Sequence, residues 1–214
     1  MLGIAELLSK HHFTTLLFDF RARGMSAGAC CTLGAKETCD VTGAVNFLAV
    51  NASTSHLDLC VIGNSMGGAA AILAAASDMR IKALVVEAAF ARLSESVEQR
   101  AKFIAGPFAK QFTAKCREIG LQTEGLKLDI DTVNPIDAIA AFSPRPIMLI
   151  TDGMDLTCSR MQSDTLFNAA SGPKERWIAP AAPHVLASRT YRTEYETRVV
   201  GFLNRGLRLN TDTP

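Results

Sequence analysis

A G-x-S-x-G motif, GNSMG at residues 63–67, is the clearest chemical pattern in the sequence. It stands between an apolar run of strand length, LDLCVIG, and an alanine-rich stretch typical of a helix, SMGGAAAILAAA. A serine on so sharp a turn has a strained backbone that exposes its hydroxyl. Glycines at Gly63, Gly67 and Gly68 leave room for strand and helix to pass closely. We predict that Ser65 is a nucleophile; the alternative is a glycine-rich turn in which it only caps the helix.

A serine hydroxyl is a weak nucleophile until a base removes its proton, so a histidine has to come from elsewhere in the chain. The sequence has four histidines. His11 and His12 end the first predicted helix and His56 lies in a polar connection, on the wrong side of a sheet or in solvent. His184 instead follows the apolar run ERWIAP, at the carboxyl end of a predicted strand. We predict that His184 is the base; the alternative is a surface histidine.

An acid that orients the imidazole is expected between Ser65 and His184 in the sequence, close after a strand. The stretch ITDGMDLTCS offers Asp152 and Asp155, and we choose Asp155. Asp152 precedes a glycine and is well placed to shape the turn by bonding its own backbone; turn chemistry alone is the alternative for both. Glu87, after the run LVV, is a rival acid because a carboxylate at that strand end could also reach the imidazole.

Five runs rich in apolar and β-branched residues predict the strands that position these side chains: TTLLFDF (14–20), LDLCVIG (57–63), IKALVVEAAF (81–90), PIMLIT (146–151) and ERWIAP (175–180). Helical patterns lie between them, at residues 2–10, 36–50, 65–76, 93–119 with a break at Gly106-Pro107, from 134, 159–169 and 190–207. This alternation predicts an α/β fold of three layers, with a mostly parallel sheet between helices. The candidate residues then share the edge where the strands end.

Composition excludes several other classes of protein. A length of 214 residues favours a single domain, 1–214. A net charge of +1 gives no field that would attract nucleic acid. No apolar run approaches the about 20 residues of a membrane-spanning helix, and the N-terminus lacks the features of a signal peptide, so we expect a cytoplasmic protein with no membrane association. The six cysteines have no metal-binding spacing, and we expect neither a metal nor an organic cofactor.

Segments that span nearly the whole chain carry a family resemblance: FDFRARGMSAG, VIGNSMGGAAAILAA, VVEAAFARL, NPIDAIAAFSPRPIMLI and PKERWIAPAAPH. Together they resemble α/β-hydrolases of the serine-aminopeptidase-like and prolyl-oligopeptidase-like group, among them bacterial fermentation-respiration-switch-like esterases. The resemblance implies a triad of Ser65, Asp155 and His184. In the family pattern H-G-x-x-D-x-x-V-P the aspartate matches Asp155, with CS in place of VP, which favours Asp155 over Asp152.

Two further segments are interpreted through the resemblance. The family's loop motif D-x-R-G-x-G-x-S here reads DFRARGMS, with Ala22 for a glycine and Met25 for a polar residue, departures that concern loop geometry rather than the reaction. Residues 93–133 correspond to the family's variable helical segment, a cap-like insertion over the site. Its aromatic residues could line an acyl pocket; the equally favoured alternative is a helix that packs its apolar face on the domain. These residues are Phe103, Phe108 and Phe112, with Ile104 beside them.

The resemblance also implies elements that have no counterpart here. In the family, strands before the first helix supply a loop with the second oxyanion donor, so Met66 of the elbow is the donor that we can name. The family's strand order also places a strand between TTLLFDF and LDLCVIG. We expect an N-terminally truncated chain, direct pairing of these two strands, or a loosely docked N-terminal unit with an open sheet edge.

These observations predict a serine hydrolase that cleaves carboxylic esters through an acyl-serine intermediate, with thioesters or short peptides as further possibilities. The expected partner is a small-molecule ester or acyl compound. One alternative is a catalytically impaired remnant that keeps the fold for binding, suggested by the missing strands and donor. Another is an acyltransferase with the same triad. Because a fold does not fix a function, the sequence leaves these alternatives open.

Overall fold

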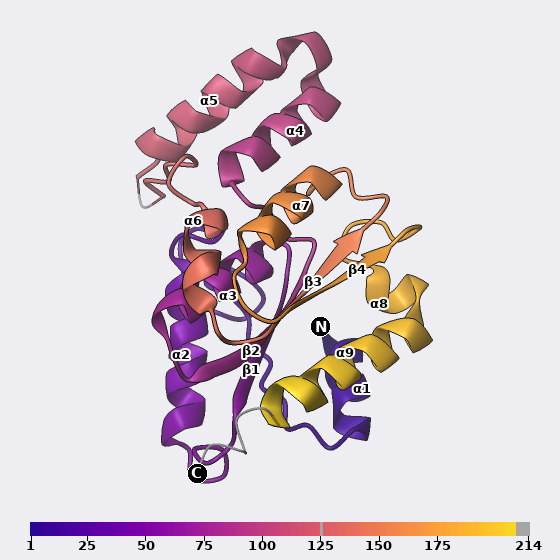
Figure 1. Ribbon diagram of the computed structural model, residues 1–214. Helices are drawn as coiled ribbons and strands as arrows, with labels where there is room; N and C mark the ends of the chain where they lie inside the picture. Colours follow the sequence, from indigo (N-terminus) through magenta and orange to yellow (C-terminus); the bar gives the residue numbers. More distant parts are fainter. Residues whose placement is uncertain (125, 209–214) are drawn as a thin grey trace.

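A four-stranded parallel sheet forms the centre of the molecule (Figure 1). The computed structural model describes residues 1–124 and 126–208. The strands lie in the order of the sequence: β1 (Leu59–Asn64), β2 (Ile81–Glu87), β3 (Ile147–Asp152) and β4 (Lys174–Ala179). β2 and β3 are buried along almost their whole length, as expected of central strands covered on both faces. Four of the five predicted strands are thus present.

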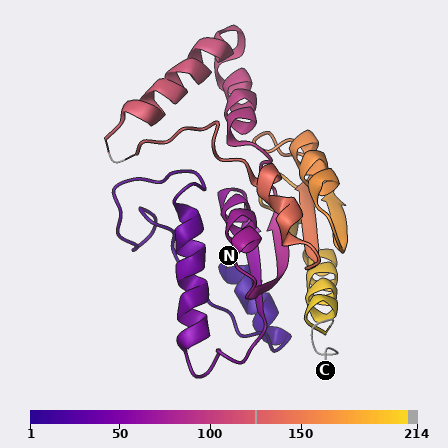
Figure 2. The same ribbon diagram turned by 60° about the vertical axis from the view of Figure 1, so that its left-hand side comes forward.

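Helices cover both faces of the sheet, which confirms the predicted three-layer α/β fold (Figures 1 and 2). One face is covered by α1 (Leu2–Lys10), α8 (Ala187–Thr190) and α9 (Arg192–Arg208). The other face is covered by α2 (Glu37–Val50), α3 (Met66–Ser77), α6 (Pro135–Ile139), η2 (Ala140–Phe142) and α7 (Arg160–Ala169). No helix in the described part of the chain is long and apolar enough to cross a membrane.

The alternation of side chains along β2 explains why the sheet has an apolar core on each face. Ala83 and Val85 point into the core under α1 and α9, whereas Leu84 and Val86 point into the core under α3. Successive strand residues face opposite sides of a sheet, so one apolar run supplies both cores. β3 repeats the pattern, and the parallel register from β1 to β4 fixes where the strand ends lie.

The segment 14–20 is the predicted strand that the structure does not contain. It forms no strand within the described residues, and Leu16, Leu17 and Phe18 are each about two-fifths exposed. A strand needs a neighbour for its backbone groups, and within residues 1–124 and 126–208 β1 pairs with β2 only, which leaves its other edge open there. The prediction from composition was wrong because pairing is not a local property. Direct pairing of this segment with β1 is likewise not observed.

A helical hairpin projects from the body of the molecule (Figure 2). It consists of α4 (Leu93–Ala105), η1 (Gly106–Phe108) and α5 (Ala109–Gln122). The break falls at Gly106-Pro107 as predicted, and Gly106 has φ 49°, which only glycine adopts easily. The predicted insertion 93–133 includes Gly125, and the predicted domain 1–214 includes residues 209–214; these positions lie outside the described residues.

Candidate active site

Ser65 stands on the sharp turn between β1 and α3. Its backbone has φ 52° and ψ −121°, which an L residue adopts only where its surroundings enforce it. The Ser65 N–H donates to the carbonyl of Glu87 at 2.8 Å, and the Ser65 carbonyl accepts from the N–H of Ala69 at 3.0 Å. These two backbone bonds tie the elbow to the end of β2 and to the first turn of α3.

Two glycines let α3 start this close to the sheet. A Cβ on Gly63 would lie 2.5 Å from the Gly67 oxygen, and a Cβ on Gly68 would lie 2.8 Å from Cγ1 of Val86. Both contacts are too short for real atoms, so a side chain at either position would push the helix away. Gly67 differs from our expectation, because a Cβ there would make an ordinary 3.4 Å contact with the ring of Phe20. The room at the elbow therefore comes from Gly63 and Gly68.

His184 lies in the loop between β4 and α8 and reaches the serine. Its Nε2 is 3.0 Å from Oγ of Ser65. The imidazole is partly buried, with 28% of the side chain exposed. His11, by contrast, bonds Glu196 at the molecular surface, at 2.7 Å. The loops after parallel strands meet at one edge of the sheet, which is why the predicted base and nucleophile come together across 119 positions of sequence.

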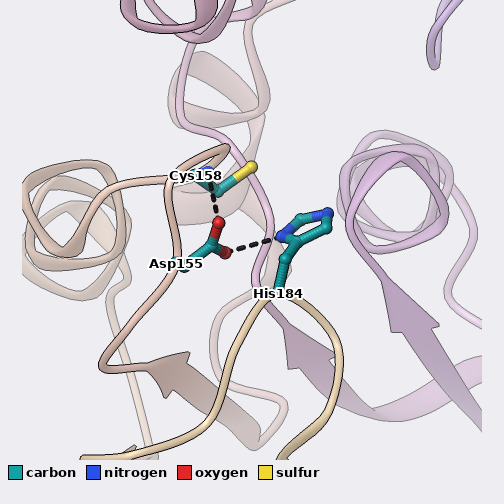
Figure 3. A group of neighbouring side chains, drawn as sticks. All are labelled: Asp155, Cys158 and His184. Carbon is teal, nitrogen blue, oxygen red and sulfur yellow. Dashed lines mark hydrogen bonds and ion pairs between the residues drawn. The ribbon is translucent and has the colours of Figure 1, made fainter. Parts of the chain in front are cut away.

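Asp155 completes a chain of hydrogen bonds with the imidazole (Figure 3). Nδ1 of His184 donates to Oδ2 of Asp155 at 2.6 Å, while Oδ1 accepts the N–H groups of Thr157 at 2.7 Å and Cys158 at 2.9 Å. Because a carboxylate can only accept, the imidazole proton lies on Nδ1 and Nε2 accepts from the hydroxyl of Ser65. In this order the imidazole can take the proton of the serine, while the carboxylate holds the orientation of the ring and stabilises the imidazolium.

The carboxylate of Asp155 raises the pKa of His184 above its usual value, mainly through the hydrogen bond from Nδ1. Partial burial of the imidazole lowers the same pKa, and the charges of Asp152 and Glu87 raise it further. The net effect is a stronger base than a free histidine. Such a group is suited to take a proton from the serine hydroxyl near neutral pH.

The two rival acids bond the backbone of the histidine loop instead of the imidazole. Oδ2 of Asp152 accepts from the N–H of Val185 at 2.6 Å, and Oε1 of Glu87 accepts from the N–H of Ala187 at 3.0 Å. Both carboxyl groups are buried, and burial raises the pKa of Glu87 to about 7 and that of Asp152 to about 6. Neither of them is hydrogen-bonded to the ring of His184 in the described structure.

A cleft of about 700 Å³ opens beside Ser65. It lies between the open edge of β1 and the segment 14–20, and its lining includes Met1, Leu2, Leu16, Phe18, Val61, Ile62, Ser65 and Met66. Met66, the expected oxyanion donor, is the first residue of α3. The N–H groups in the first turn of a helix have no acceptor within the helix and are directed at its N-terminal end. The cleft can therefore present an acyl group to the hydroxyl and to this amide.

The aromatic residues expected to line an acyl pocket lie on the surface of the hairpin. Phe103, Phe108 and Phe112 are 63%, 67% and 40% exposed. Their helices α4 and α5 pack mainly on one another and stand away from the sheet (Figure 1). The structure does not enclose these three side chains in a pocket, and it does not pack them on the body of the domain.

Three side chains at the site offer ligand atoms that a metal ion could use. Oxygen, sulfur and nitrogen atoms of Asp155, Cys158 and His184 lie within 4.8 Å of one another (Figure 3). Asp155 and His184 are bonded to each other, however, and burial raises the pKa of the Cys158 thiol to about 12. A thiol that keeps its proton is a poor ligand. The donor set fits a hydrogen-bonded triad better than a metal site.

Two features of the site were missed by the sequence analysis. The first is the contact of Asp152 and Glu87 with the backbone beyond His184, for which acids at the ends of two neighbouring strands were the available signal. The second is the backbone of Val185, with φ 55°. A β-branched residue rarely adopts this conformation, and no sequence pattern predicts it.

Comparisons of sequence place the chain among known proteins. The family described as serine aminopeptidase S33 matches residues 1–135, a stretch that contains Ser65 and ends before Asp155 and His184. The uncharacterized protein YfhR of Escherichia coli O157:H7 is 25% identical over 203 residues, which are 94% of this chain and 63% of YfhR. The uncharacterized protein PA2218 of Pseudomonas aeruginosa is 25% identical over an alignment of length 254, which covers 95% of this chain and 68% of PA2218. The chain thus spans less than two thirds of YfhR.

Comparisons of structure agree with the sequence matches. The esterase Pf2001 of Pyrococcus furiosus superposes with a TM-score of 0.79 at 25% identity, over 97% of this chain and 76% of the esterase. The α/β-hydrolase GrgF from Penicillium sp. sh18 shares the fold, with a TM-score of 0.72 at 20% identity over 97% of this chain and 84% of GrgF. The family match covers more than half of this chain. The chain therefore belongs to the serine aminopeptidase S33 family of α/β-hydrolases.

Proposed function

We propose that this protein hydrolyses carboxylic esters through an acyl-serine intermediate. The observation that carries the proposal is the continuous chain of hydrogen bonds from Oγ of Ser65 to Nε2 of His184, at 3.0 Å, and from Nδ1 to Asp155, at 2.6 Å. Triads of this kind are recognised by their geometry and roles, not by fold or position. The likeness to an esterase at 25% identity supports an ester as substrate.

Acylation follows from the direction of the hydrogen bonds. Nε2 of His184 takes the hydroxyl proton while Oγ of Ser65 attacks the carbonyl carbon, and the carbonyl electron pair moves to oxygen. The amide of Met66 donates to this oxyanion, and Asp155 stabilises the imidazolium through Nδ1–H. The tetrahedral intermediate collapses, the alcohol leaves with the proton from Nε2, and the acyl group remains on the serine.

Deacylation repeats the same steps with water in place of the serine hydroxyl. His184 takes a proton from water, the resulting hydroxide attacks the acyl carbon, and Oγ of Ser65 leaves with the proton from Nε2. The carboxylic acid is released and the triad returns to its initial state. The same chemistry extends to thioesters and short peptides, whose carbonyl carbons react in the same way.

Esters with good leaving groups are expected to be the fastest substrates. Among the described residues the amide of Met66 is the oxyanion donor that we identify, and loss of one donor typically lowers kcat by about 10²–10³. An activated ester needs less stabilisation of its intermediate, so it depends less on the number of donors. We expect measurable turnover of p-nitrophenyl acetate and much slower turnover of ethyl acetate.

Labelling with a fluorophosphonate tests the assignment of the nucleophile, because this probe reacts with activated serines. We expect stoichiometric labelling of the protein at Ser65, identified by peptide mass spectrometry, and no labelling of Ser65→Ala. Ser55→Ala, at an exposed serine, is the matched control and should be labelled like the parent. Labelling that persists in Ser65→Ala would contradict the proposed mechanism.

A further inference from the structure

The backbone directly after the proposed base is strained. Val185 has φ 55°, a conformation in which the Cβ of a β-branched residue crowds its own backbone. Such conformations persist only where the surrounding structure enforces them. Because His184 is the preceding residue, the peptide of Val185 fixes the direction from which the imidazole enters the site. Whatever enforces this conformation also positions the base.

Two buried carboxyl groups enforce it, each from a different strand. Asp152 at the end of β3 accepts the N–H of Val185 at 2.6 Å, and Glu87 at the end of β2 accepts the N–H of Ala187 at 3.0 Å. Glu87 is fully buried and Asp152 is 2% exposed. Burial shields both hydrogen bonds from water, which strengthens them. The segment 185–187 is thus held at two points.

The second oxygen of each carboxyl group lacks a partner. Oε2 of Glu87 and Oδ1 of Asp152 are buried and accept no hydrogen bond from the described residues. Neither group forms an ion pair within residues 1–124 and 126–208. Burial is the main cause that raises the pKa of Glu87, and the charge of Asp152 is the next. Two buried carboxyl groups that repel each other are stabilised when one of them carries a proton.

Five other titratable groups face this pair. Asp155, Cys158 and His184 lie in the adjoining loops, Tyr195 projects from α9, and the amino group of Met1 lies at the start of α1. Burial keeps Tyr195 neutral because it raises the pKa of the phenol. The remaining carboxylate, Asp155, repels Asp152 and so favours a proton on the pair. An imidazolium on His184 acts in the opposite direction.

We propose that Glu87 and Asp152 act as positioning residues, which clamp the backbone of residues 185–187 and thereby aim His184 at Ser65. Neither carboxyl group touches the reacting atoms. The inference rests on the proposed function for its catalytic consequence, although the clamp itself is a property of the fold. The sequence analysis weighed Glu87 and Asp152 as substitutes for the triad acid; the structure gives them a different task.

Substitutions of Glu87 distinguish a role in positioning His184 from a role in stabilising the buried core alone. Gln keeps an oxygen that accepts from Ala187 and is neutral, like a protonated Glu, whereas Ala removes the bond. We expect Glu87→Ala to lower kcat on p-nitrophenyl acetate by about 10²-fold, the effect of a displacement of about 1 Å, with KM within twofold. Glu87→Gln should keep kcat within about threefold at pH 6.5. The matched control is Glu37→Ala, which removes a buried carboxylate that holds the backbone of Thr32 and Gly34.

The pH profile gives a readout that a merely structural role would not move. As pH rises above about 7, the value that burial and Asp152 give the pKa of Glu87, the pair loses its proton and repulsion opens the clamp. The parent should therefore lose kcat at alkaline pH, and Glu87→Gln, which cannot ionise, should not. Identical alkaline limbs in the two proteins would overturn the coupling of the clamp to the charge of Glu87.

Val185→Gly tests whether strain is what the clamp opposes. Glycine adopts φ 55° without penalty, so it should need the clamp less. In the Glu87→Ala background we expect Val185→Gly to restore at least about tenfold of the lost kcat, a non-additivity typical of coupled residues. Additive effects, or a loss of kcat in Glu87→Ala no larger than in Glu37→Ala, would overturn the proposal.

A spectroscopic measurement keeps the clamp testable even where no turnover is found. The proton on Nδ1 of His184, bonded to Asp155, should give a far-downfield NMR signal in the parent and in Ser65→Ala. We expect the signal to vanish in Glu87→Ala, to persist in Glu87→Gln, and to return in Glu87→Ala/Val185→Gly. Absence of Ser65-dependent hydrolysis together with this pattern would reject the proposed function and support the clamp. A signal unchanged in Glu87→Ala would reject the clamp, whether or not the protein is a hydrolase.

Discussion

The two sides of Ser65 differ in how their backbone segments are held in place. On one side β2, β3 and β4 pair in register, and acids at their ends bond either the ring of His184 or the backbone beyond it. On the other side β1 has an open edge, and the segment 14–20 runs along the cleft without pairing. Proton transfer requires exact alignment, which paired strands and buried hydrogen bonds provide. The acyl group would enter from the less constrained side.

The largest effect is expected on the well-paired side, from Asp155→Asn. The amide can donate a hydrogen bond to Nδ1, which favours the tautomer with its proton on Nε2 and deprives Ser65 of its acceptor. By analogy with the triad template, kcat should fall about 10⁴-fold. Steady-state hydrolysis of p-nitrophenyl acetate measures this change, with circular dichroism as a check that the protein remains folded.

Asp152→Asn is the comparison for this substitution. Its amide oxygen can still accept from Val185, so the loss should be far smaller than that of Asp155→Asn. The reverse ranking would move the role of the acid to Asp152. If neither change matters and Glu87→Gln abolishes turnover, the contact seen between Asp155 and His184 is not the catalytic one.

The next effect concerns stability, which Glu87 should couple to pH. Burial raises its pKa from 4.5 to about 7, so the folded protein keeps this proton to a higher pH than the unfolded chain does. The stability linked to Glu87 is therefore complete below about pH 4.5 and is lost as pH rises through 7. Relative to the parent, Glu87→Gln should gain on the order of 3 kcal/mol in free energy of unfolding between pH 4.5 and 8.

Urea unfolding at several pH values tests the coupling, and Glu37 provides a control of opposite sign. Burial alone would raise the pKa of Glu37, but hydrogen bonds from Thr32 and Gly34 lower it below its usual value. Glu37→Gln should thus lose stability relative to the parent as pH rises through the acid range. Parallel curves for the parent and Glu87→Gln would show that Glu87 ionises as it does in the unfolded chain.

A smaller effect is expected from the titration of His184. Below the pKa of His184, kcat/KM should fall about tenfold for each unit by which the pH is lowered. Only neutral His184 can take the proton of Ser65, so on the acid side of the profile kcat/KM should rise with pH up to the pKa of His184. Asp155 raises that pKa from 6.5, mainly by accepting the bond from Nδ1. The inflection should lie above 6.5 in the parent and move to lower pH in Asp155→Ala. An inflection that stays in place would show that another group limits the rate.

The difference between the paired side and the open side of Ser65 explains what could be predicted from the sequence. Local patterns predict the elbow and the four paired strands. The order of Ser65, Asp155 and His184 follows from the general rule that parallel strand ends share an edge. The failure at 14–20 has the opposite cause, because an apolar β-branched run specifies a strand only when a neighbour is present. The clamp consists of two hydrogen bonds, from Val185 to Asp152 and from Ala187 to Glu87, between residues that are 33 and 100 positions apart. Acids at two strand ends hint that the groups are close, but a single sequence does not show which backbone groups they bind.

The smallest change in stability is expected on the open side, at Leu17. Its side chain is 42% exposed, and surface substitutions of this kind usually alter the free energy of unfolding by less than about 0.5 kcal/mol. An unpaired edge with exposed apolar residues favours association between copies, and a charge on it opposes this. Leu17→Lys should therefore reduce concentration-dependent self-association, measured by sedimentation velocity, while thermal unfolding stays nearly unchanged. Met79→Lys, at an apolar side chain 61% exposed and away from the cleft, is the control. Equal self-association of both variants and the parent would show that the open side of Ser65 is not where copies meet, and that the unpaired edge is protected in a way that exposure alone does not reveal.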